Sequence, residues 1–273
     1  MLTKKIIFCT QISCFFMEQY SVFSIKTQII KYFIAIVCLI TPLFADIREC
    51  PNLTPLYEEL LRCDHNTLCL FDVGNTLLTP KDPVLYPRFA KWKDRWFKTY
   101  YPHMTSQDKL FLARIIEATD HIWILAEDWP SLLKIAHELN IKTAALTQVI
   151  LDLSLEQIRV QRLQRFNLMF QDGLADFPYQ HRLFTYKNGL IQTNQPYKGD
   201  ALKEFLIKLN VLPSKIIFID DMRQQLQSVE KICAEMQILF VGFHYTGGEK
   251  NGCFDEISAS FQLTTLVEQH RWP

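Results

Sequence analysis

The sequence shows no surplus of positive charge, no internal repeat and no low-complexity tract. Its 29 lysines and arginines balance 29 aspartates and glutamates, giving a formal net charge of +0. The basic footprint expected of a nucleic-acid-binding protein is therefore missing, and no nucleic-acid partner is expected. No segment recurs at the period of about 20–50 residues that is typical of solenoids and propellers. With 273 residues, 49% of them hydrophobic, the chain is expected to form one large domain or a domain with an insertion.

Residues 1–45 have the pattern of a secretory leader. Lys26 and Lys31 precede the apolar run YFIAIVCLI, and Leu43 and Ala45 form a small-residue cleavage pattern in TPLFAD. This order predicts a signal peptide cut after Ala45 and an exported protein, periplasmic or secreted. The apolar run is about a dozen residues long, shorter than the roughly 20 that span a bilayer. An uncleaved membrane anchor is the alternative, and a membrane is a partner only in that case.

The stretch before this pattern leaves the start of the chain open. Residues 1–25 would be a long preamble for a signal peptide, so Met17 is an alternative start. Removal of residues 1–45 takes away four lysines and one glutamate. The exported protein would therefore be slightly acidic.

Cysteine and histidine usage predicts no zinc site. There is no C-x-x-C pair, and the 7 histidines show no H-x-x-x-H or similar ligand spacing. Export would permit a disulfide, and Cys50 with Cys63 is the pair nearest a chain end. Cys69 and Cys233 are expected to be small buried apolar residues instead.

The body of the sequence alternates apolar strands with amphipathic helices. Short apolar runs predict strands that are buried on both faces, at 67–72, 141–147, 215–221 and 237–245. Helical periodicity lies between them, at 128–140, 198–210 and 222–236. In the first helix Asp128 is expected to cap the start, and Pro130 suits the first turn. This alternation predicts an α/β fold, a doubly wound three-layer sandwich with a mainly parallel sheet.

Two stretches interrupt the alternation. The segment at about 80–127 is rich in aromatic and charged residues and is too long for a simple crossover, so we expect a small inserted helical cap. Its tryptophans either line a substrate mouth or only pack its helices; they are Trp92, Trp96 and Trp123. In the second stretch, Asn188-Gly189 predicts a hairpin with a type I′ turn.

Polar residues stand where the predicted strands end. Asp72 follows the first strand, Thr147 the second, and Asp220 with Asp221 the third, while Lys198 opens the helix before the third strand. Ligands of open parallel sheets bind at the carboxyl ends of the strands. Crowded carboxylates repel one another unless a cation lies among them, and oxygen ligands of this kind suit Mg²⁺. The remaining metal positions would go to water and a substrate phosphate.

Four segments in this order resemble the motifs of the haloacid dehalogenase (HAD) superfamily of phosphohydrolases. They are FDVGNTLL, ALT, YKGDAL and IIFIDD, and together they cover about 150 residues. The further combination of KG-x-x-L, IIFIDD and VGFHYTG resembles a poorly characterised branch of exported bacterial HAD-like proteins.

The resemblance implies a role for each residue. Asp72 would be the nucleophile, and Thr147 and Lys198 would hold the phosphoryl group and serve catalysis. Asn75 and Thr76 would join them in binding substrate. The Mg²⁺ ligands would be Asp72, the backbone carbonyl of Gly74, Asp220 and Asp221.

Gly74 departs from the pattern. The resemblance implies a second aspartate at this position, as the acid that protonates the leaving group. Glycine keeps the carbonyl but removes the acid, and positioned acid/base catalysis contributes about 10²- to 10⁴-fold. Asp94, Glu117 and Asp120 in the cap are substitute candidates.

Three functions fit this sequence, and the first is favoured. The first is an exported Mg²⁺-dependent phosphatase or phosphotransferase with attenuated turnover. The second is a non-catalytic protein that binds a phosphorylated small molecule or a protein partner. The third is another chemistry, such as dehalogenation or phosphonate cleavage.

Each candidate residue also has a structural interpretation. Asp72 could begin a turn, Thr147 could cap a helix, and Lys198 could be a solvated lysine. Adjacent carboxylates after IIFI serve no packing purpose, although one of Asp220 and Asp221 could lie behind the metal without binding it directly.

Overall fold

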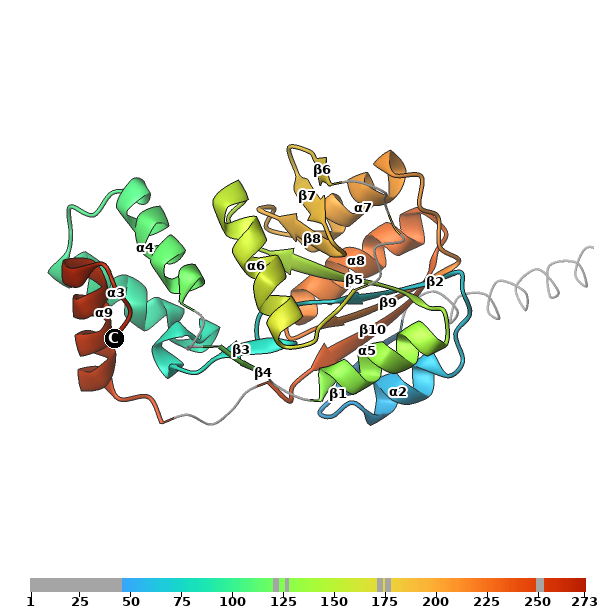
Figure 1. Ribbon diagram of the computed structural model, residues 1–273, viewed down its shortest axis with the longest axis horizontal. Coiled ribbons are helices and arrows are strands. Elements are labelled where there is room, and N and C mark those ends of the chain that lie inside the picture. Colours follow the sequence, from blue (N-terminus) through green and yellow to red (C-terminus); the bar gives the residue numbers. More distant parts are fainter. Residues whose placement is uncertain (1–45, 120–122, 126–127, 171–173, 175–177, 249–252) are drawn as a thin grey trace, which may run out of the picture. The chain divides into compact units, whose positions relative to one another are not determined.

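The computed structural model describes residues 46–273 apart from 120–122, 126–127, 171–173, 175–177 and 249–252. Its main feature is an eight-stranded sheet in the order β1-β10-β9-β2-β5-β8-β7-β6 (Figure 1). All pairs from β1 to β8 are parallel, and the β8–β7 and β7–β6 pairs are antiparallel. The bounds are β1 Asp46–Cys50, β2 Thr67–Phe71, β5 Lys142–Gln148, β6 Tyr179–Gln180, β7 Phe184–Lys187, β8 Leu190–Thr193, β9 Lys215–Asp220 and β10 Leu239–Tyr245. The predicted α/β class with a mostly parallel sheet is confirmed.

Helices cover both faces of this sheet because successive strand residues point to opposite sides. In β2, Cys69 and Phe71 enter one core with α2, α5 and α6, while Leu68 and Leu70 enter a second core with α7 and α8. The helices are α2 Thr54–Leu60, α5 Trp129–Glu138, α6 Leu153–Arg165, α7 Lys198–Lys208 and α8 Arg223–Glu235. Burial on both faces explains the continuous apolar character of the central strands.

The predicted strands and helices agree with the structure to within a few residues. The hairpin is confirmed too, because Asn188 (φ 48°) and Gly189 (φ 75°) both take the left-handed conformation that a type I′ turn requires. Asp128 is the N-cap residue of α5 but makes no cap bond to the backbone; its carboxylate accepts from Ser131 Oγ at 3.0 Å. Strand β1 and the helices α2 and α6 were not predicted.

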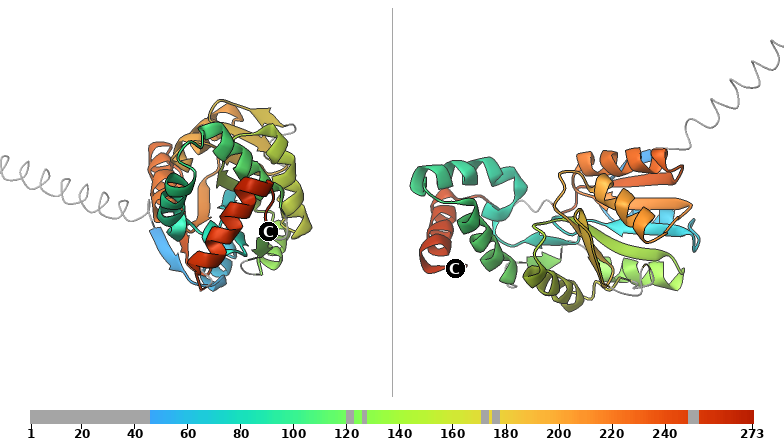
Figure 2. Two further views of the ribbon diagram at one scale, coloured as in Figure 1. Left: turned by 90° about the vertical axis from the view of Figure 1, so that its left-hand side faces the viewer. Right: turned by 90° about the horizontal axis from the view of Figure 1, so that it is seen from above.

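A second group of helices has its own small core. It contains the 3₁₀ turns η2 Pro83–Leu85 and η3 Pro87–Phe89, and the helices α3 Ala90–Tyr100 and α4 Ser106–Ala118. The antiparallel strands β3 Leu78–Pro80 and β4 Trp123–Leu125 flank this segment. Helix α9 Glu256–Gln269 packs with it through Ala259, Leu263 and Leu266 (Figure 2). The cap predicted from residues 80–127 did not include this C-terminal helix.

Two of the cap tryptophans pack helices. Trp96 is buried in the small core, and Trp92 makes an edge contact with Phe254 at 4.9 Å between ring centroids. Neither lines the cavity described below, and the side chain of Trp123 lies outside the described residues.

The described cysteines are all free. Cys50 Sγ donates to the Asn52 carbonyl at 3.0 Å and Cys63 Sγ to the Glu59 carbonyl at 3.2 Å. The disulfide considered for Cys50 and Cys63 is therefore absent, whereas Cys69 and Cys233 are buried as predicted.

The leader, with its proposed cut at Ala45 and the alternative start at Met17, lies outside the described residues. In the part of the chain that the structure describes, no helix is both long enough and apolar enough to cross a bilayer.

Candidate functional site

Three carboxylates meet at the carboxyl edge of the central sheet. Asp72 follows β2, Asp220 ends β9 and Asp221 comes next, and one ligand oxygen from each lies within 4.8 Å of the others. They meet because β2 and β9 are parallel neighbours in register, Phe71 opposite Ile219, and the Asp72 amide extends the ladder to the Ile219 carbonyl at 2.8 Å. We call these three residues the aspartate cluster.

Lys198 is held inside this cluster. Its Nζ contacts Asp72 Oδ1 and lies 2.6 Å from Asp220 Oδ2, and its side chain is 3% exposed. The backbone amide of Lys198 donates to Gln225 Oε1 at 2.9 Å, and Gln225 Nε2 donates to the Pro196 carbonyl at 3.0 Å. The solvated-lysine interpretation is therefore wrong. Buried Gln225, which anchors the start of α7, was missed by the sequence reasoning, since a single glutamine carries no motif.

The cluster holds more negative than positive charge. Burial, followed by the charges of Asp72 and Asp220, raises the pKa of Asp221 to about 8. Burial also raises the pKa of Asp220 to about 6, a rise that the charge of Lys198 opposes. Burial would lower the pKa of Lys198, but the carboxylates of Asp220 and Asp72 raise it overall. When ionised, three carboxylates and one ammonium leave a net charge that a divalent cation would neutralise.

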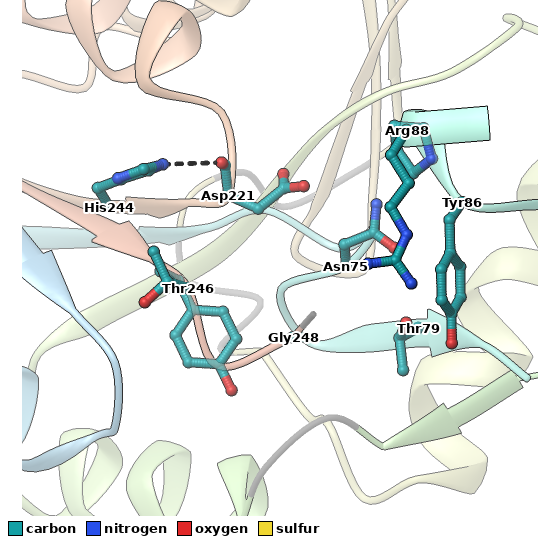
Figure 3. A pocket seen from close by; sticks show the side chains of 10 residues that line it. Asn75, Thr79, Tyr86, Arg88, Asp221, His244, Thr246 and Gly248 are labelled. Atoms are coloured by element: carbon teal, nitrogen blue, oxygen red, sulfur yellow. Dashed lines mark hydrogen bonds between the residues drawn. The ribbon is translucent and has the colours of Figure 1, made fainter. Parts of the chain in front are cut away.

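Asp220 and Asp221 differ in what their oxygens contact. Asp220 is fully buried, and its Oδ1 accepts from the Met222 amide at 2.7 Å while Oδ2 faces Lys198. Asp221 is only partly buried and its carboxyl points into a cavity, while its backbone carbonyl lies 3.0 Å from His244 Nε2 (Figure 3). The carboxylate oxygens of Asp221 are thus more accessible to a metal ion or other ligand than those of Asp220, which hold Lys198 in place.

The loop after Asp72 brings Thr76 and Asn75 to the cluster. Thr76 Oγ1 donates to Asp72 Oδ2 at 3.2 Å, and the Asn75 side chain acts to lower the pKa of Asp221, against the larger effect of burial. Asn75 has a left-handed backbone (φ 60°), which asparagine tolerates better than most residues. A Cβ at Gly74 would meet nothing within 4 Å. The loop therefore has space for a side chain at position 74.

Thr147 lies apart from these contacts. It is near the end of β5, 6% exposed and opposite Gln192 of β8. In the described part of the chain no hydrogen bond joins its hydroxyl to the aspartate cluster. Its strand is the neighbour of β2, so it stands on the same edge of the sheet, and its role in phosphate binding stays a prediction.

Among the described residues, the cap does not bring a substitute acid to the aspartate cluster. Glu117 lies 3.0 Å from Arg162 Nη1 and 3.5 Å from Arg159 Nε, an ion pair between α4 and α6. Asp94 is an exposed residue of α3, and Asp120 lies outside the described residues.

A cavity of about 310 Å³ adjoins the aspartate cluster at Asp221. Figure 3 shows Asp221 and His244 on one side and Tyr86, Arg88 and Thr79 on the other. The remaining lining residues are Asn75, Pro87, Tyr245, Thr246 and Gly248. Arg88 was missed by the sequence reasoning because an arginine in a charged, aromatic segment gives no sign of the direction it faces.

The protein belongs to a family described as "Protein of unknown function (DUF2608)", whose model matches residues 49–267. A curated protein of Chlamydia trachomatis (serovar D), named "Putative outer membrane protein", is 22% identical over 94 residues. The match covers 34% of this chain and 36% of that protein, so the chain spans about a third of the length of the relative it matches. No solved structure matches the chain.

These findings correct the assignment to the HAD superfamily. The matching family is a different one, and nothing in the matches points to HAD proteins. Short motifs at strand ends recur in unrelated proteins, because open parallel sheets of many families place polar residues at this edge. Any role of Asp72, Lys198 and the other site residues therefore rests on the contacts that these residues make.

Proposed function

We propose that the protein is an exported, Mg²⁺-dependent phosphohydrolase, a phosphatase or phosphotransferase, with Asp72 as nucleophile. The observation that carries this proposal is the aspartate cluster, in which the described residues place three carboxylates beside the ammonium of Lys198. Perturbed carboxyl pKa values beside a cavity are typical of functional sites.

The residues present fit a hard divalent cation. Asp221 and Asp72 would be its carboxylate ligands, the Gly74 carbonyl is the predicted third, and water and a phosphate oxygen would complete the shell. When bound, Mg²⁺ would neutralise charge on the phosphoryl oxygens. Lys198 already touches Asp72, so its ammonium would orient that carboxylate and lie beside the phosphoryl group.

Asp72 is suited to attack phosphorus. Thr76 and Lys198 hold its two oxygens from different sides, which limits rotation of the carboxylate. Attack forms a bond from the carboxylate oxygen to phosphorus while the bond from phosphorus to the leaving oxygen breaks. Water then attacks the aspartyl phosphate, releases phosphate and restores the carboxylate. An acceptor hydroxyl in place of water would make the reaction a phosphotransfer.

Gly74 supports slow turnover of ordinary alkyl esters. It supplies no acid to protonate the leaving oxygen, so a poor leaving group must depart without help. The missing contribution is about 10²- to 10⁴-fold. Aryl and acyl phosphates, whose leaving groups need no protonation, would suffer least.

A non-catalytic protein that binds a phosphorylated ligand or a protein partner is the second candidate. The contact that favours it is the pairing of Lys198 with both Asp72 and Asp220, which by itself satisfies these two carboxylates. Under this function the cluster would bind phosphate through metal and lysine without attack by Asp72.

Export is supported by the leader pattern and by the name of the Chlamydia relative. A cut after Ala45 would keep the whole of β1, which begins at Asp46 and pairs with β10. Mass spectrometry of the N-terminus of the native protein tests the cleavage, and a protein that still contains residues 26–45 would contradict it.

The proposed activity is tested with an activated aryl phosphate and an acyl phosphate, each with and without Mg²⁺. We expect Mg²⁺-dependent hydrolysis that disappears in Asp72→Asn. Gly74→Asp should accelerate it about 10²-fold or more, because the added side chain enters open space. Asp200→Asn, an exposed substitution on α7, is the matched control and should change nothing. No hydrolysis by the wild type or by Gly74→Asp would favour the binding protein.

A further inference from the structure

The cavity beside Asp221 has the features of a site for the rest of the substrate. One end is the Asp221 carboxyl, which belongs to the aspartate cluster, and the other end is formed by Thr79, Tyr86 and Arg88 (Figure 3). A phosphoryl group held at the cluster would therefore extend its organic part toward these three residues.

Arg88 is presented to this cavity by two aromatic rings. It lies in η3 between Pro87 and Phe89, with its guanidinium carbon 5.2 Å from the centroid of Tyr86 and 5.0 Å from that of Phe89. Stacking on aromatic faces orients the planar guanidinium. A guanidinium in this position is suited to bind a carboxylate with two parallel hydrogen bonds.

Thr79 is an independent sign of a ligand. It is fully buried in β3 and lines the cavity, yet its hydroxyl has no hydrogen-bond partner among the described residues. Buried hydroxyls are nearly always paired, and an exception needs an explanation such as an absent ligand. A ligand hydroxyl at this end of the cavity would supply the partner.

The volume of the cavity limits the size of the ligand. At about 310 Å³, the cavity lies at the lower end of the range of about 300–1,000 Å³ that is typical of ligand pockets. This volume suits a phosphomonoester with a short carbon chain.

We propose that the cavity holds a small phosphorylated hydroxy acid, with Arg88 binding its carboxylate and Thr79 its hydroxyl. This inference rests on the proposed function for the position of the phosphoryl group. It adds the substrate class and two specificity-determining residues, Arg88 and Thr79.

The test uses two ligands that differ only at the group Arg88 would bind. 3-Phosphoglycerate and glycerol 3-phosphate share a three-carbon skeleton, a phosphate and a central hydroxyl, but the first ends in a carboxylate and the second in an alcohol. Calorimetric titration in the presence of Mg²⁺ measures their binding without any need for turnover. We expect 3-phosphoglycerate to bind about tenfold tighter or more, as befits one charge-assisted pair.

Three variants assign this preference to residues. Arg88→Met keeps the length of the side chain and should reduce the preference to about twofold or less, whereas Arg95→Met, an exposed arginine of α3 outside the cavity, should leave it unchanged. Arg88→Lys, which keeps the charge without the planar fork, should be intermediate. Thr79→Val should weaken both ligands to the same extent, because both carry the central hydroxyl.

The outcomes separate this inference from the proposed function. Equal binding of the two ligands, or a preference that survives Arg88→Met, would overturn the inference even if the aryl phosphate is hydrolysed. A preference lost in Arg88→Met without hydrolysis of any phosphate would support the site while rejecting catalysis. Failure of both ligands to bind, together with no hydrolysis, would reject both proposals.

Discussion

Strand β9 has buried charged side chains near both of its ends, and the two groups are balanced differently. At its start, Lys215 contacts Glu59, which also accepts from Arg48 Nη1 at 2.7 Å. At its end, Lys198 is the cation that the described residues bring into contact with the aspartate cluster. Burial would raise the pKa of Glu59, but hydrogen bonds from Lys215 and Arg48 lower it overall. The pKa of Asp221, by contrast, is raised to about 8.

This contrast separates a structural ion pair from a candidate functional site. Glu59 has two cations for one carboxylate, so its charge is satisfied by the protein alone. Among the described residues, the aspartate cluster has three carboxylates and one ammonium, so when ionised it carries a surplus of negative charge. Burial alone does not distinguish the two groups, since Glu59 and Asp220 are both buried.

The largest expected effect is the change in stability when a carboxylate is removed at either end of strand β9. The change has opposite signs at the two ends. Glu59→Gln should lower the free energy of unfolding by about 3 kcal/mol, because it leaves Lys215, whose side chain is only 13% exposed, without its carboxylate. Asp221→Asn should raise the stability of the metal-free protein at neutral pH. The folded state must keep a proton on Asp221 that the unfolded state releases, and asparagine carries no such cost. Urea denaturation in EDTA measures both, with exposed Glu58→Gln as the neutral control. A comparable loss of unfolding free energy in Asp221→Asn and Glu59→Gln would contradict the distinction between the aspartate cluster and the structural ion pair at Glu59.

The second effect is stabilisation by Mg²⁺. A ligand that binds only the folded state raises the free energy of unfolding by about 2.7 kcal/mol when its free concentration is about 100 times its dissociation constant. We expect this gain in the wild type and in Glu59→Gln, whose aspartate cluster is intact, and little of it in Asp221→Asn. Thermal unfolding with and without Mg²⁺ measures it. A full gain in Asp221→Asn would show that this carboxylate is not a ligand.

The third effect is the pH dependence of stability. The folded-state pKa of Asp221 is raised to about 8, so the folded state binds its proton more tightly than the unfolded state. Stability of the metal-free protein should therefore fall as pH rises from about 4 to about 8. Each kcal/mol lost corresponds to a Tm decrease of about 2–4 °C for a chain of this size.

Two comparisons sharpen this pH measurement. The fall in Tm should be smaller in Asp221→Asn and in wild type with Mg²⁺. The pKa of Glu59 is lowered in the folded state. The stability that Glu59 contributes is therefore present above its unfolded-state pKa, and it is lost only as pH falls through its folded-state pKa. A Tm that rises between pH 5 and pH 8 in EDTA would contradict the assignment for Asp221.

The smallest effect is expected at Arg48. Its side chain is 38% exposed, and Glu59 keeps Lys215 when Arg48 is removed. Arg48→Gln should therefore lower the free energy of unfolding by only about 0.2–1 kcal/mol. Urea denaturation at low and high salt measures this, and a loss as large as that of Glu59→Gln would show that Arg48 is the essential partner.

Much of the sheet could be predicted because its signals are local. Apolar runs identified β2, β5, β9 and β10, and Asn188-Gly189 identified the hairpin. Strand β1 was missed because its sequence DIREC is charged, as an edge strand facing solvent can be. Helix α9 was missed as part of the cap because its packing partners are more than a hundred residues away in the sequence.

The residues of the candidate site likewise divide into those that the sequence predicted and those that it did not. Asp72, Asp220, Asp221 and Lys198 could be named from the sequence because strand ends are predictable and parallel strands end at one edge. The family suggested by the same motifs was wrong, since so few residues do not distinguish common ancestry from a shared arrangement. Arg88 and Thr79 could not be named, because the sequence does not tell which way their side chains face.

The sequence by itself determined the alternation of strands and helices and the carboxylates at the strand ends, because periodicity and propensity act over a few neighbouring residues. Only the tertiary structure decided that Lys198 lies between Asp72 and Asp220, that Glu59 is satisfied, and that Asp221 faces a cavity. The physical reason is that burial and charge balance depend on side chains that are distant in the sequence and meet only when the sheet forms.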